Sequence, residues 1–160
     1  MQLNPELDLE LDRLLSAPPA LVWRCWTEPD LICQWFCPKP WQVSEAVIDL
    51  RPGGRFFTRM NGPDGESFPN EGCFLEIVPQ RKLVFTDMFG ADYAPVAVLE
   101  SGAGLSFSAI LTFTPEGSGT RYRAVARHRS AADAQTHKTM GFYEGWGAAA
   151  DQLDELARRL

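Results

Sequence analysis

Apolar residues recur every three or four positions through the last thirty residues of the chain. The stripe consists of Met140, Tyr143, Trp146, Ala150, Leu153, Leu156 and Leu160, the spacing of one face of an α-helix. Ser130 with Asp133 resembles a capping box at its start. Arg158 and Arg159 suit the negative end of a helix dipole. The pattern predicts one helix over 130–160, about 45 Å long, which needs a large apolar surface beneath it.

The preceding part of the chain alternates between apolar and polar residues. Leucines at 7, 9, 11 and 15 alternate with acidic residues, which predicts a half-buried strand. Six further strands are predicted at 41–50, 55–60, 67–78, 82–89, 105–114 and 120–129, separated by turn signals. Consecutive hairpins indicate an antiparallel sheet. Pro19 and Pro29 each open a short helix after the first strand. We therefore expect an α+β fold forming a single domain over 1–160.

The last predicted strand distinguishes the two faces of the sheet. Four arginines, at 121, 123, 127 and 129, share one side, whereas Tyr122, Ala124, Ala126 and His128 share the other. A row of arginines belongs in water, so the second side is expected to face inward. A curved sheet with one helix across it tends to leave a hollow. We expect its mouth near the fifteen-residue loop at 90–104, because loops this long are usually functional or disordered.

Charge and composition exclude several classes of partner. The chain has 160 residues, 45% of them hydrophobic, and a net charge of −6, which argues against nucleic acid. No apolar run has the length of a membrane span, and the N-terminus has no signal-peptide layout. We expect a cytoplasmic protein without membrane insertion, and a homodimer remains open. Cys33 and Cys37 have a poor spacing for metal binding. We expect buried free thiols, no metal and no cofactor.

Four stretches resemble a known protein family. They are WRCWTEPDLICQWFCP (23–38), IDLRPGGRF (48–56), GPDGESFPNEGCFLEIVP (62–79) and MGFYEGWGAAADQL (140–153). Together they resemble bacterial proteins of the SRPBCC superfamily, in the branch named for similarity to the activator of the heat-shock-protein-90 ATPase. The resemblance covers about 7–156. It implies a START-like helix-grip fold, in which a seven-stranded antiparallel sheet wraps around a long C-terminal helix and encloses a cavity. It brings no shared catalytic motif, so the catalytic residues are unknown.

The expected function is binding of a small apolar or amphipathic molecule in a cavity between the sheet and the C-terminal helix. The residues expected to line this cavity are Trp35, Phe56, Met60, Phe68, Phe85, Phe107, His128, Met140, Tyr143 and Trp146. One alternative is an enzyme of the cyclase, dehydratase or hydrolase kind, using His128 or a carboxylate among Glu71, Asp87 and Glu144. A second alternative is a chaperone-associated binding module with a patch on its outer surface.

Three glycines in the predicted helix, at 141, 145 and 147, need an explanation. Each costs about 1 kcal/mol relative to alanine inside a helix. Close packing on the sheet or a kink would offset that cost. Alternatively, a missing side chain makes room for a ligand, and Gly145 is the position we assign to this role.

Overall fold

The computed structural model describes residues 1–96 and 105–160. In chain order its elements are β1 (Asp8–Leu15), α1 (Pro19–Thr27), α2 (Pro29–Ile32), β2 (Gln42–Ile48), β3 (Arg55–Asn61), β4 (Ser67–Val78), β5 (Lys82–Thr86), the 3-10 turn η1 (Ala91–Tyr93), β6 (Phe107–Glu116), β7 (Gly119–His128), α3 (Ala131–Thr139) and α4 (Phe142–Arg158). The predicted α+β class and the two short helices after the first strand are confirmed. The segment 97–104 of the predicted loop, and with it part of the expected cavity mouth, lies outside the described residues.

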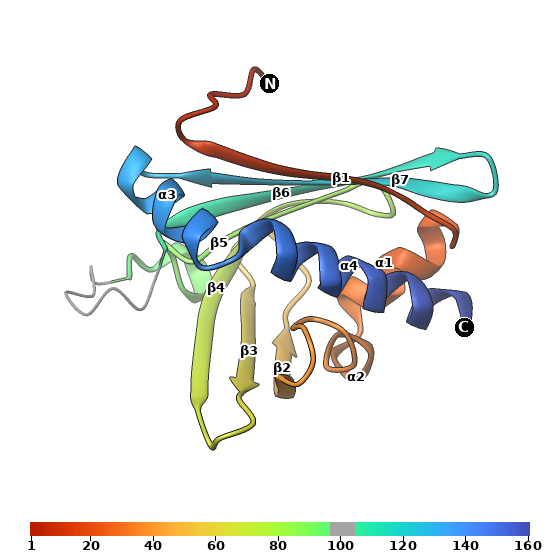
Figure 1. Cartoon of the computed structure of the whole chain (residues 1–160), viewed down its shortest axis with the longest axis horizontal. Coiled ribbons are helices and arrows are strands. Elements are labelled where there is room, and N and C mark those ends of the chain that lie inside the picture. The colour runs from red at the N-terminus through yellow and green to blue at the C-terminus, as the bar shows by residue number, and fades with distance from the viewer. Residues whose placement is uncertain (97–104) are drawn as a thin grey trace.

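The seven strands form one antiparallel sheet in the order β1-β7-β6-β5-β4-β3-β2. The first strand pairs with the last, so β1 and β2 form opposite edges. In Figure 1, α4 runs along the sheet on the side opposite the N-terminal tail, and β2, β3 and β4 turn past it in a different direction from β1, β6 and β7. This arrangement matches the predicted helix-grip fold.

The two faces of the sheet are as the alternation predicted. Tyr122, Ala124 and Ala126 are buried, and Leu9 lies opposite Ala126 across the edge pairing. On the outer face Arg123 bonds Glu10 at 2.8 Å. Similarly, Arg127 bonds the fully covered carboxylate of Asp8 at 3.0 Å. Asp8 and Arg127 face each other directly across the strands, and Glu10 and Arg123 are diagonal neighbours. Opposite charges in these positions favour this register over a shifted one.

The prediction of one continuous C-terminal helix is wrong, because the range 130–160 forms two helices, α3 and α4. Gly141 stands between α3 and α4 with φ of 98°, a backbone conformation that interrupts a right-handed helix and that glycine adopts at little cost. The expected cap is confirmed, since Ser130 Oγ accepts a hydrogen bond from the Asp133 amide. Met140 precedes the break and is 70% exposed, so the apolar stripe does not continue through it.

Helix α4 is fixed to the sheet by apolar packing and by two polar side chains. Leu153, Leu156 and their alanine neighbours are buried in the main core. Asp154 accepts hydrogen bonds from the amides of Ser16 and Ala17, just after β1. Gln152 donates to the carbonyl of Trp35 at 3.0 Å. The C-terminal part of α4 is thereby joined to the chain on both sides of α1 and α2.

Within the two described ranges, no helix combines the length and the apolar character needed to cross a membrane.

Candidate functional site

Five aromatic rings gather where the two C-terminal helices meet β6 and β7. They come from β6 (Phe107), β7 (His128), α3 (His137) and α4 (Phe142 and Trp146). The ring of His137 lies 5.2 Å from that of Phe107, 5.1 Å from that of Phe142 and 6.0 Å from that of Trp146. We call this group the aromatic–histidine cluster. It brings together residues that are up to 39 positions apart in the chain (146 minus 107).

The two histidines of the chain hydrogen-bond to each other inside this cluster. Nε2 of His128 lies 2.8 Å from Nδ1 of His137, and Nδ1 of His128 lies 2.9 Å from the carbonyl oxygen of Leu7. A carbonyl only accepts, so Nδ1 of His128 carries its proton and Nε2 of the neutral ring accepts. Nδ1 of His137 must then donate. The remaining ring nitrogen, Nε2 of His137, therefore holds a lone pair.

The environment keeps His137 uncharged near neutral pH. Burial is the main cause, and the neighbouring His128 adds to it; together they lower the pKa of His137 from 6.5 to about 4. His137 as a whole residue is 7% exposed. Among residues 1–96 and 105–160, none hydrogen-bonds its Nε2. Among the described residues the one buried side-chain nitrogen or oxygen without a hydrogen-bond partner is Trp26 Nε1, so Nε2 of His137 keeps some contact with solvent. It is therefore the polar atom of the cluster that a ligand can reach.

Asp87 supports the cluster from the end of β5. Its carboxylate accepts hydrogen bonds from the amides of Ser106 and Phe107, at 3.2 and 3.0 Å. Burial raises the pKa of Asp87, while these amides act in the opposite direction. Of the other candidate carboxylates, Glu71 pairs with Arg55 at 3.0 Å, and Glu144 is exposed. Only Asp87 is connected to the cluster, through the backbone of Phe107.

Nine of the ten residues predicted to line one cavity fall into three groups, and Met60 belongs to none of them. Phe107, His128 and Trp146 belong to the aromatic–histidine cluster. Those in the main core are Trp35, Phe56 and Phe85, and Met60 is half-buried. The remaining three lie at the surface, namely Phe68, Met140 and Tyr143, with 52, 70 and 41% exposure. Phe68 projects from the exposed first half of β4 and contacts Trp41. These last three residues therefore do not line an enclosed cavity.

Two members of the cluster, His137 and Phe142, were not among the predicted residues. His137 belongs to a helix that buries only Ala134 and His137. It therefore has almost no apolar periodicity to reveal its inner face. The one available signal was that the chain has two histidines and that one of them, His128, was expected to face inward.

A shallow hollow of about 310 Å³ borders the cluster. It is lined by the N-terminal segment, α3 and the start of α4, through Pro5, Glu6, Leu9, Ala131, Ala134, Gln135, Lys138 and Tyr143. Leu9 in its wall also packs with Phe142, Phe107 and Trp146. Tyr143 is the one predicted ligand-binding residue in this wall. The hollow is open to solvent beside the cluster.

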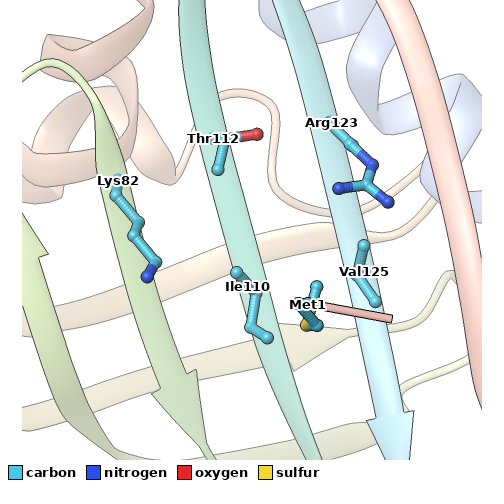
Figure 2. Close-up of a pocket in the computed structure, with 6 residues that line it drawn as sticks. All are labelled: Met1, Lys82, Ile110, Thr112, Arg123 and Val125. Carbon is cyan, nitrogen blue, oxygen red and sulfur yellow. The ribbon is translucent and has the colours of Figure 1, made fainter. Parts of the chain in front are cut away.

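A second hollow, of about 200 Å³, lies on the opposite face of the sheet (Figure 2). Its walls are Met1, Lys82 from β5, Ile110 and Thr112 from β6, and Arg123 and Val125 from β7. The charges there are already compensated, since Lys82 pairs with Glu76 and Arg123 with Glu10. None of the predicted ligand-binding residues lies in it.

The described residues contain no group of three His, Cys, Asp or Glu side chains arranged to hold a metal ion. The four cysteines are free. Burial raises the pKa of Cys25 and of Cys37 to about 11, so these two thiols are protonated near neutral pH.

Comparisons with known proteins agree with this fold. A protein from Nitrosomonas europaea of known structure is 43% identical, with 98% of this chain and 97% of that chain covered and a TM-score of 0.92. A Mycobacterium smegmatis protein is 28% identical, with coverage of 94 and 90% and a TM-score of 0.77. An AHSA1-like protein from Aeromonas hydrophila is 20% identical, with coverage of 96 and 93% and a TM-score of 0.69, and shares the fold.

No curated protein matches the chain. The family model of the Activator of Hsp90 ATPase homolog 1-like proteins matches residues 16–158. Nearly the whole fold is therefore covered, from the end of β1 to the end of α4. The resemblance of the four sequence stretches is confirmed, and the chain belongs to the family of Activator of Hsp90 ATPase homolog 1-like proteins.

Proposed function

We propose that the protein binds a small apolar or amphipathic molecule at the aromatic–histidine cluster, between the sheet and the C-terminal helices. The observation that carries this proposal is the available Nε2 of His137 within a group of aromatic rings. Ligand sites are mostly apolar and contain a few polar groups that fix orientation. Phe107 and Trp146 supply the apolar surface, and they also pack against both core clusters.

Access to the cluster is expected from the hollow beside α3. Gly145 of α4 faces Pro38, and a Cβ atom placed there would meet no other side chain within 4 Å. We expect the glycine to leave room there for a ligand that extends along α4 from the cluster. Binding without chemistry is favoured over catalysis, since a histidine whose pKa is about 4 is a weak general base near neutral pH.

A neutral fluorescent probe, Nile red, tests the proposal. We expect the wild-type protein to bind it, and we expect Trp146→Ala to weaken binding about tenfold or more, because burying an aromatic side chain contributes roughly 1.5–3 kcal/mol. Phe68→Ala is the matched control. Phe68 is exposed, and its strand β4 is separated by β5 from β6, the nearer of the two strands that contribute to the cluster. Equal affinities of wild type and Trp146→Ala would contradict the site, as would wild-type protein that binds no probe.

Gly145→Leu provides a second test of the same site. A leucine at this position would occupy the space beside Pro38. We expect weaker uptake of Nile red with a melting temperature close to that of the wild type. If Gly145 instead serves only packing, the variant should lose stability while retaining probe affinity, since overpacking costs about 1–3 kcal/mol.

A further inference from the structure

We infer that the ligand of the aromatic–histidine cluster donates a hydrogen bond to Nε2 of His137, so that the site selects neutral phenols and alcohols over carboxylate amphiphiles. The inference rests on the proposed function and specifies the chemical class of the ligand. It follows from the direction of the hydrogen bonds through the histidine pair and from the charges around it.

The direction of the hydrogen bonds is set at the carbonyl of Leu7. This oxygen accepts from Nδ1 of His128, so Nε2 of the same ring accepts from Nδ1 of His137. In the neutral pair each ring donates toward Leu7. The far end of this relay is a lone pair on Nε2 of His137. It matches a hydroxyl donor, whereas an ionised carboxylate offers only acceptors.

The charged groups around the cluster do not favour an anion. Directly after β5, Asp87 carries a carboxyl group that already accepts a hydrogen bond from the backbone amide of Phe107. Arg127 of β7 is paired with Asp8 of β1, and Arg129, directly after β7, is paired with Asp133 of α3.

Two further charged side chains near the cluster, Lys138 and Glu144, are at the surface. Lys138 of α3 is exposed and shares the neighbouring hollow with Glu6 of the N-terminal segment. Glu144 of α4 is exposed. A carboxylate placed among the rings would lose its hydration, and that desolvation is costly. Lys138, which forms no ion pair with another described residue, lies in the exposed wall of the hollow, where water screens its charge.

Three probes of one shape separate the possibilities: 2-naphthol, which donates and accepts; 2-methoxynaphthalene, which only accepts; and 2-naphthoate, which is an anion. Dissociation constants are measured near neutral pH by NMR titration. We expect 2-naphthol to bind about 3- to 10-fold more tightly than 2-methoxynaphthalene, the factor that one net hydrogen bond supplies. We expect 2-naphthoate to bind more weakly than both.

His137→Phe retains an aromatic ring and removes the acceptor. We expect the preference for 2-naphthol over 2-methoxynaphthalene to disappear, with the affinity for 2-methoxynaphthalene retained. Lys138→Ala is the control for binding of an anionic head group in the hollow, and we expect it to leave the preference unchanged. Preference for 2-naphthoate in the wild type, lost in Lys138→Ala, would overturn the inference.

A measurement on the wild-type protein avoids any effect of substitution on folding. The chain has two histidines, so their four ring nitrogens can be followed individually by ¹⁵N NMR. We expect 2-naphthol, and not 2-methoxynaphthalene, to shift Nε2 of His137 in the direction of a hydrogen-bonded nitrogen. If both probes bind and neither shifts this nitrogen, the inference fails while the proposed function stands. If neither probe, nor Nile red, binds, the proposed function fails.

Discussion

Nε2 of His128 and Nδ1 of His137 form a hydrogen bond of 2.8 Å that joins β7 to α3. Helix α3 buries only Ala134 and His137, so it has little apolar surface with which to pack on the sheet. The histidine pair supplies a directional contact instead. Through the carbonyl of Leu7, the same relay also reaches the segment preceding β1.

Stability should depend on pH through His137. The pKa of this group is lowered by burial from 6.5 to about 4 in the folded protein. In the unfolded chain the ring takes up a proton as pH falls through about 6.5, whereas the folded protein does so only near 4. The free energy of unfolding should therefore fall over this interval, by roughly 3 kcal/mol.

Comparison with His137→Phe isolates this effect from the titration of the carboxylates. Denaturant unfolding of both proteins at several pH values gives the difference in their stability. We expect the wild type to lose stability relative to the variant as the pH is lowered from about 6.5 to about 4. Parallel curves over this range would show that the folded protein does not keep His137 uncharged.

Gly141, between the two C-terminal helices, and Gly145, inside α4, should respond in opposite ways to replacement by alanine. Gly141 has φ of 98°, where a side chain is strained, and Gly141→Ala should lose about 1–2 kcal/mol. Gly145 is helical and has room for a Cβ. Gly145→Ala should gain up to about 1 kcal/mol. Urea unfolding measures both. A gain in stability for Gly141→Ala would be inconsistent with the break between α3 and α4.

Asp154 should matter more for stability than its neighbour Asp151. The Asp154 carboxylate accepts from two backbone amides and from Ser16 Oγ, whereas Asp151 forms an exposed ion pair with Arg13. Asp154→Ala should lose about 1.5–3 kcal/mol, the range for hydrogen bonds to a charged group. Asp151→Ala should change stability by less than about 1 kcal/mol. Similar losses in the two variants would show that these amide contacts contribute little.

The thiols should react slowly in the native protein. Cys25 and Cys37 are buried with a pKa of about 11, and burial also raises the pKa of Cys33. Since the thiolate is the reactive form, we expect slow labelling by Ellman's reagent, followed by release of four equivalents in denaturant. Rapid labelling of the native protein near neutral pH would show that a thiolate is accessible.

Much of the sheet was predictable from residues close together in the chain. Alternation placed Ala124 and His128 on the inner face and Arg123 and Arg127 on the outer face. It succeeds because successive side chains of a strand point to opposite sides, whatever the rest of the chain does. The helix cap at Ser130 was equally local, since the hydroxyl and the amide that it contacts are three residues apart.

The break between α3 and α4 at Gly141 could not be predicted from local patterns. The three-to-four spacing of Met140, Tyr143 and Trp146 fits a continuous helix, and glycine is compatible with both a helix and a left-handed turn. The chosen conformation depends on how α3 reaches β7 while α4 packs on the core.

By itself, the sequence determined the class of fold, the faces of the strands and, through its resemblance, the family. The tertiary structure alone decided which residues meet. It paired His128 with His137, a residue on a nearly polar helix, and it left Phe68 and Met140 exposed. Periodicity specifies the direction of a side chain relative to its own element. The distance between side chains on different elements depends on how those elements pack, and no local pattern encodes that distance.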